Sequence, residues 1–307
     1  MLGPKIEGLP DDSHPKLRCL LHLAQLFTSV GNYVECKRLL SHVLELRRKQ
    51  NICKRFLIAG ILKTLSSTNL QLGLYAEGIQ QAKQAIRINK WTFNTSEQAI
   101  TWEILARLLH ADGQLDAAQE AVSQAINLLP GKGEEFIVCQ CYALLGQIHQ
   151  SEGEMDTALA HFETALRITS PFNWHNQRSG IHHYLAELLS EQGKFNEANG
   201  HIEHAKLHAA NNIYSLGCTI YLQAEIWYKE QRFGEAKSEV LHAVAIFEEL
   251  GAAEMLGGCE ELLNYIEEGM HEWATASGSG SGGKLLGTVQ PPLSVDPPPA
   301  AGPSRSN

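Results

Sequence analysis

The sequence predicts an all-α protein, a solenoid of about six helical hairpins followed by a C-terminal capping helix. A helix-breaking glycine recurs along the chain, with an aromatic or apolar residue two positions later and a small residue five positions later. Successive copies lie 42, 40, 40, 40 and 38 residues apart, and periods of about 20–50 residues are typical of solenoids. Ala, Leu, Glu and Gln are frequent, whereas the alternation of β-branched residues that strands require is scarce.

The clearest copy occupies residues 102–130. One helical stripe, at spacings i, i+3, i+4 and i+7, consists of Trp102, Leu105, Ala106 and Leu109. Gly113 then ends this helix, because glycine adopts the left-handed conformation without a Cβ clash. A second stripe consists of Ala118, Ala121, Val122 and Ala125, and this helix stops at Pro130. One hairpin cannot bury both stripes, so each is expected to pack on the next.

The other copies share the same three positions. They are Gly31/Tyr33/Cys36, Gly73/Tyr75/Gly78, Gly113/Leu115/Ala118, Gly153/Met155/Ala158 and Gly193/Phe195/Ala198, and a sixth, Gln231/Phe233/Ala236, lacks the glycine. Twelve residues after each glycine position stands a further small or β-branched residue, namely Val43, Ala85, Ala125, Ala165, Ala205 or Ala243.

Taken in order, the chain divides into three parts. Residues 1–14 are predicted to be an unstructured lead-in, whose abrupt start suggests a fragment of a longer protein. Residues 15–273 form the solenoid, with loops near 50–56, 89–97, 130–134, 170–177 and 211–215 and a closing helix over 255–273. Residues 274–307, rich in Gly, Ser and Pro, are expected to be disordered.

Two signals coincide at the start of the third hairpin. Thr95-Ser96-Glu97-Gln98 fits a capping box, in which the first hydroxyl and the last amide satisfy free backbone N–H groups. Asn94-Thr95-Ser96 also spells a glycosylation sequon. Without a secretory signal we interpret this segment as a helix start rather than as a sugar site.

Charge and composition exclude several classes of protein. A net charge of −9 and a pI near 5.9 disfavour a nucleic-acid binder, which would need a basic stripe, and they favour a partner with a basic segment. We find no signal peptide and no apolar run long enough to span a membrane. The seven cysteines are odd in number and form no CxxC pair, as expected of free thiols in the cytoplasm.

No motif predicts catalysis or a cofactor. GSGSGGKL at residues 278–285 imitates a phosphate-binding loop, but Leu285 replaces the hydroxyl residue that holds Mg²⁺. His201, His204 and His208 share one helix face, with His182 and His183 one helix earlier, yet no HExxH or carboxylate completes a zinc site. The sequence also lacks a G-x-S-x-G elbow. We therefore predict no enzyme, no cofactor and no metal.

The repeated positions over residues 15–254 resemble the tetratricopeptide repeat (TPR). The period is about 40 rather than 34, Gly78 stands where Ala is usual, and the sixth copy lacks its glycine. Longer-period repeats of this kind are similar to those of kinesin light chains and of the sensor arms of fungal signal-transduction (NACHT/NB-ARC type) NTPases. Residues 134–175 look most like the latter. The resemblance implies a right-handed superhelix that recognises a partner and performs no chemistry.

In the resembled repeat, the first helix of each hairpin lines a concave face. The partner-binding positions that this implies are Lys63, Glu103, Arg107, His110, Gln147, His183, Glu187, Glu191, Tyr221, Glu225 and Glu230, with Arg18, Gln25, Gln140 and Lys229 as further members. This face is mixed in charge at its N-terminal end and mostly acidic at its C-terminal end. The predicted function is binding of a peptide or protein segment; the alternative is a ligand-sensing arm of a STAND-type NTPase whose nucleotide-binding domain is absent from this chain.

Overall fold

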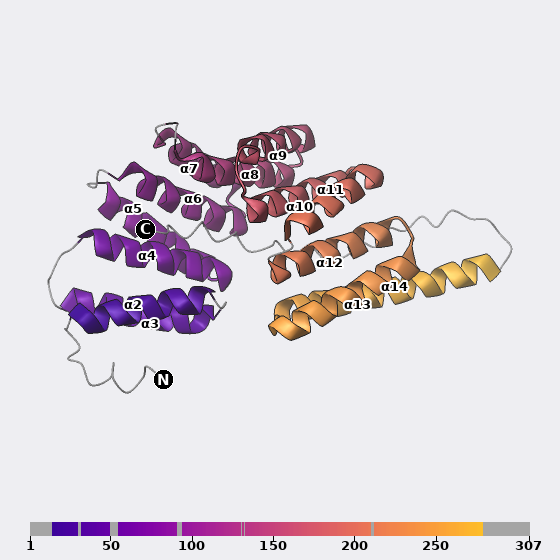
Figure 1. The fold of residues 1–307 in the computed structure, drawn as a ribbon, viewed down its shortest axis with the longest axis horizontal. Helices are drawn as coiled ribbons and strands as arrows, with labels where there is room; N and C mark the ends of the chain where they lie inside the picture. The colour runs from indigo at the N-terminus through magenta and orange to yellow at the C-terminus, as the bar shows by residue number, and fades with distance from the viewer. Residues whose placement is uncertain are drawn as a thin grey trace. The chain divides into compact units, whose positions relative to one another are not determined.

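In the computed structural model, the described residues are 14–29, 32–49, 55–90, 94–129, 131, 133–209 and 212–278, and over these the chain contains thirteen α-helices and no strand (Figure 1). The chain divides into two compact units, residues 1–154 and 155–307, and each is described by itself. Most of the predicted lead-in, residues 1–13, and residues 279–307 of the predicted tail lie outside the described residues.

The first unit holds seven helices. They are α2 (His14–Ser29), α3 (Tyr33–Lys49), α4 (Arg55–Gln71), α5 (Tyr75–Asn89), α6 (Thr95–Ala111), α7 (Leu115–Asn127) and α8 (Glu135–Ser151). The pairs α2/α3, α4/α5 and α6/α7 are antiparallel hairpins. Each second helix also packs on the first helix of the following pair, and α4, α6 and α8 lie in sequence against one another.

The second unit continues the same order of packing. Its helices are α9 (Met155–Thr169), α10 (His175–Glu191), α11 (Phe195–Ala209), α12 (Ile213–Lys229), α13 (Phe233–Leu250) and α14 (Ala253–Gly278). The hairpins are α10/α11 and α12/α13, and α14 packs along α13. The predicted all-α arrangement of successive helical hairpins is confirmed.

Four of the described turns between helices share the same Schellman motif around a glycine. Gly73, Gly113, Gly153 and Gly193 have φ values of 67°, 77°, 81° and 73°. The residue after each glycine donates its backbone N–H to the carbonyl five residues earlier, for example Gln114 to Leu109 at 2.8 Å. The backbone conformation therefore favours glycine at these positions, as the sequence predicts.

The small residues of the repeat form the core of the hairpins. The positions five and twelve residues after each glycine position are all buried, and Ala118, Ala125, Ala198 and Ala205 have no exposed surface. Gly78 stands where the repeat usually has Ala, and there is a steric reason for this exchange. A Cβ there would stand 2.6 Å from Cδ2 of Leu108 on α6, so only glycine fits without moving that side chain.

Two helix boundaries differ from those predicted. The N-cap of α6 is Asn94 rather than Thr95, because the Asn94 side chain accepts a hydrogen bond from the backbone N–H of Glu97 at 3.1 Å. The last helix, α14, begins at Ala253 and continues to Gly278, a few residues beyond the predicted start of the tail.

Candidate functional site

The predicted binding face of the first unit lies on α4, α6 and α8, the first helices of successive hairpins. Lys63, Arg107, His110, Gln140 and Gln147 are partly exposed there. Glu103 is different, because only 5 % of its surface is exposed. Of the two further members on α2, Gln25 is exposed; nothing is described of the Arg18 side chain.

Most charges of this face are already paired within the unit. Lys63 on α4 donates to Glu97 on α6 at 2.5 Å. Arg107 forms an ion pair with Glu103 one turn earlier. Nε2 of His110 on α6 lies 3.0 Å from Oγ of Ser151 at the end of α8. The first and third of these contacts join neighbouring first helices, whereas the Arg107–Glu103 pair lies within α6. Lys63 and Arg107 therefore offer less free charge to a partner than the sequence suggests.

Three predicted residues of the second unit's face are buried, and one of them is the acidic Glu225. His183, Tyr221 and Glu225 each expose only 2 % of their surface. Burial raises the pKa of Glu225 to about 8, against a smaller lowering effect of Lys229. Burial also lowers the pKa of His183 to about 4 and raises that of the Tyr221 hydroxyl. In this conformation, these side chains and Glu103 cannot contact a partner.

The remaining residues of this face reach solvent. Glu191 is exposed and Glu187 partly exposed, both on α10. Glu230 accepts from Arg232 at 3.3 Å, and the exposed Lys229 lies 3.3 Å from the Ser190 hydroxyl. Glu187 and Glu191 therefore carry most of the acidic character that the sequence assigns to four glutamates.

A histidine stack that the sequence only partly indicates lies between α10 and α11. The His182 ring packs against those of His201, His204 and His208 at centroid distances of 5.2, 5.0 and 5.9 Å. The His204 and His208 rings lie face to face with His182, and only His201 brings a nitrogen within hydrogen-bond distance, 2.9 Å between the two Nδ1 atoms. Burial and then the neighbouring histidines lower the pKa of His182 to about 3.

This stack borders a hollow of about 460 Å³. Its walls come from the end of α9, the first half of α10 and the end of α11, and include Arg167, Arg178, His182, His208 and Glu163. The Arg178 guanidinium is held by the carbonyls of Thr169 and Ser170 at 3.3 and 3.1 Å. It therefore caps the end of α9 instead of pointing freely into the hollow.

The comparisons with known proteins agree with the fold. Residues 140–171 match the family model of the tetratricopeptide repeat. The fold of the described residues is a TPR-like helical solenoid. A Rap protein crystallised with the competence and sporulation factor superposes on this chain with a TM-score of 0.65 at 15 % identity, over 87 % of this chain and 78 % of the other. The Rap conjugation regulator of plasmid pLS20, in complex with the Phr* peptide, gives a TM-score of 0.64 at 15 % identity, over 87 % of this chain and 77 % of the other.

A further similarity is to a protein that matches by sequence. The photosystem I assembly protein Ycf3 of Synechococcus elongatus is 27 % identical over 150 residues, which span 48 % of this chain and 83 % of Ycf3. The resemblance to tetratricopeptide repeats is thus supported by a family model and by fold. The closer resemblance to sensor arms of fungal NTPases stays a prediction. None of the helices that the structure describes is both long and apolar enough to cross a membrane.

Proposed function

We propose that this chain is a non-catalytic protein-interaction module that binds a peptide or protein segment along the first helices of its hairpins. The observation that carries the proposal is the fold itself: in each unit the successive first helices, α4, α6 and α8 or α10 and α12, pack side by side and offer polar, partly exposed side chains. The two Rap proteins of similar fold were solved in complex with the competence and sporulation factor and with the Phr* peptide, which supports a peptide-sized ligand here. A location in the cytoplasm remains part of the proposal.

The partner proposed for the second unit carries a basic segment. Glu187 and Glu191 lie one turn apart on α10 and both reach solvent. A Lys or Arg of the partner would complement them, and complementary potentials at an interface mainly raise the association rate and the specificity. Because Glu103 and Glu225 are buried, they are left out of the binding set.

Charge reversal tests this placement. Affinity purification of the full chain followed by mass spectrometry identifies a partner, and its affinity is then measured for the Glu187→Lys/Glu191→Lys variant. We expect affinity to fall at least tenfold at low salt and less at high salt, because exposed charges are screened. Helical content is expected to stay unchanged.

The matched control reverses two exposed glutamates on second helices, Glu203→Lys on α11 and Glu248→Lys on α13. It alters the net charge by the same amount and is expected to leave the affinity within about twofold. An equal loss in both variants, or no loss in the α10 variant, would contradict the proposed binding face.

The more specific alternative is a ligand-sensing arm of a STAND-type NTPase. It rests on the resemblance of residues 134–175 to the sensor arms of fungal signal-transduction NTPases. The test is whether the gene, or a neighbouring reading frame, encodes a phosphate-binding loop that follows a strand and opens a helix. A co-purifying protein with such a loop would favour this alternative.

A further inference from the structure

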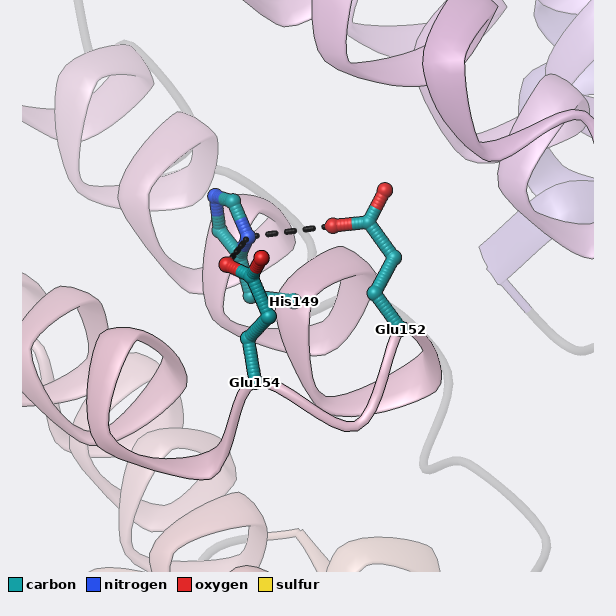
Figure 2. A group of neighbouring side chains, drawn as sticks. All are labelled: His149, Glu152 and Glu154. Atoms are coloured by element: carbon teal, nitrogen blue, oxygen red, sulfur yellow. Dashed lines mark ion pairs between the residues drawn. The ribbon is translucent and has the colours of Figure 1, made fainter.

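Three potential metal ligands converge at the end of α8. Nδ1 of His149 lies 3.1 Å from Oε2 of Glu152 and 3.1 Å from Oε2 of Glu154. Figure 2 shows the two carboxylates approaching the same ring nitrogen from different sides. Among the residues that the structure describes, this is the one group of three or more His, Cys, Asp or Glu side chains with ligand atoms all within 4.8 Å of one another.

The hairpin turn brings these residues together. Glu152 is the C-cap of α8, Gly153 takes the left-handed conformation, and the backbone N–H of Glu154 donates to the carbonyl of His149 at 2.8 Å. This hydrogen bond folds the chain back, so Glu154 stands beside a residue five positions earlier. His149 is buried, while the Glu152 and Glu154 side chains are 24 % and 57 % exposed, which leaves the group open to an ion from solvent.

The repeat itself does not require these residue types. His149 stands four positions before the helix-breaking Gly153, Glu152 stands one position before it and Glu154 one position after it. The equivalent triplets elsewhere are Phe27/Val30/Asn32, Asn69/Leu72/Leu74, Leu109/Asp112/Gln114, Leu189/Gln192/Lys194 and Trp227/Glu230/Arg232. No other copy combines an imidazole with two carboxylates, and the first position is apolar in four of the other five. The fourth hairpin therefore carries a feature beyond what packing needs.

We propose that His149, Glu152 and Glu154 bind a divalent transition-metal ion of the zinc class. Ligand atoms about 2.0–2.1 Å from a tetrahedral zinc ion are about 3.3–3.5 Å apart, close to the two 3.1 Å separations observed. An imidazole nitrogen disfavours Mg²⁺ and Ca²⁺, which prefer oxygen ligands only. The two carboxylates neutralise the ion, and three protein ligands leave a fourth position for water or for a partner's side chain.

The surroundings of the group suit a cation. The helix C-terminus carries a partial negative charge from its last carbonyls. The second ring nitrogen, Nε2 of His149, lies 3.3 Å from the side-chain amide of Gln119 on α7. With a metal on Nδ1, Nε2 carries the proton. The Nε2–H can then donate a hydrogen bond to the Gln119 amide oxygen, once the amide group is turned over. Gln119 is thus placed to fix the tautomer that the site needs.

Zinc titration of the full chain tests the proposal. Isothermal titration calorimetry of chelator-treated protein with ZnCl₂ is expected to show one site with a dissociation constant in the micromolar range or below. The Glu152→Gln/Glu154→Gln variant keeps the shape of both exposed side chains and is expected to bind at least tenfold more weakly, with unchanged circular dichroism. Bound Co²⁺ reports geometry, since its visible absorption is intense when four-coordinate, and this signal is expected to be lost in the variant.

The chain contains fourteen histidines, so the control removes another candidate. His204→Ala, in the exposed part of the histidine stack, is expected to leave zinc affinity within twofold. Absence of zinc binding by the unaltered chain, or unchanged affinity in the double Gln variant, would overturn the proposal. So would a tenfold loss on His204→Ala, which would place the ion between α10 and α11.

Discussion

Gln231 occupies a backbone position that five other hairpins give to glycine. Its φ is 62°, and it is the one non-glycine residue with positive φ in the described part of the chain. Arg232 nevertheless donates to the Trp227 carbonyl at 2.8 Å, so the Schellman hydrogen bond is kept. The left-handed conformation costs a side-chain-bearing residue about 1–2 kcal/mol. The sixth turn is therefore held by packing of α12 against α13 in spite of its residue type.

Gln231→Gly is expected to raise the free energy of unfolding by about 0.5–1 kcal/mol, since relief of the backbone strain exceeds the added entropy of glycine in the unfolded chain. The measurement is urea denaturation followed by circular dichroism. The reverse exchange, Gly193→Gln, is expected to destabilise by about 1 kcal/mol. A Cβ at Gly193 meets no atom within 4 Å, so this control isolates the backbone cost. Equal midpoints for all three proteins would contradict the strain argument.

At the scale of the helices, the sequence was sufficient where structure is determined locally. Gly113 ends a helix and Ala118 begins the buried stripe of the next because of rules that act within about ten residues, so hairpins and register could be predicted. The N-cap of α6 was missed by one residue because Asn94 and Thr95 are both good caps. Only the structure shows which side chain reaches the Glu97 N–H.

Overpacking tests the register of the hairpins. Ala118 on α7 has no exposed surface and belongs to the core shared by α5, α6, α7 and α8. Ala118→Leu is expected to destabilise the chain by about 1–3 kcal/mol, because the added atoms have no space. The control Gln124→Leu changes an exposed residue of the same helix and is expected to shift a thermal midpoint little. A melt of Ala118→Leu that matches the unaltered chain would disprove the register.

At the scale of the whole molecule, burial was the property that the sequence could not supply. Counting from the helix-breaking residue places Glu225 and His183 correctly along their helices. It does not reveal how closely the neighbouring hairpins cover them, because that depends on contacts between residues about 40 positions apart. The sequence therefore predicted four exposed glutamates on the candidate face. In the structure Glu225 is buried, and its pKa is raised. The group at His149 was missed for a different reason: its members are close in sequence, but their spacing does not show that the turn brings the three side chains together.

The buried ionisable groups predict how stability depends on pH. His182 and His183 have pKa values lowered from 6.5 to about 3 and about 4. Below pH 6.5 the unfolded chain takes up protons at these positions that the folded chain does not, so stability falls as pH falls. The pKa of Glu225 is raised from 4.5 to about 8. Above pH 4.5 the unfolded chain loses this proton and the folded chain keeps it, so Glu225 makes stability fall as pH rises towards 8.

Between pH 4.5 and 6.5 the two trends oppose each other, and the effect of the two histidines on stability is larger than that of the one glutamate. Between pH 6.5 and 8 only the effect of Glu225 acts. Stability measured by urea denaturation is therefore expected to be greatest near pH 6.5, with a slope approaching about 1.4 kcal/mol per pH unit for a difference of one proton. Glu225→Gln removes the decline on the alkaline side and so is expected to stabilise the chain at pH 8 more than at pH 5. Glu191→Gln, an exposed change, serves as the control. A profile of Glu225→Gln parallel to that of the unaltered chain would show that Glu225 is ionised in the folded protein, which would contradict the raised pKa.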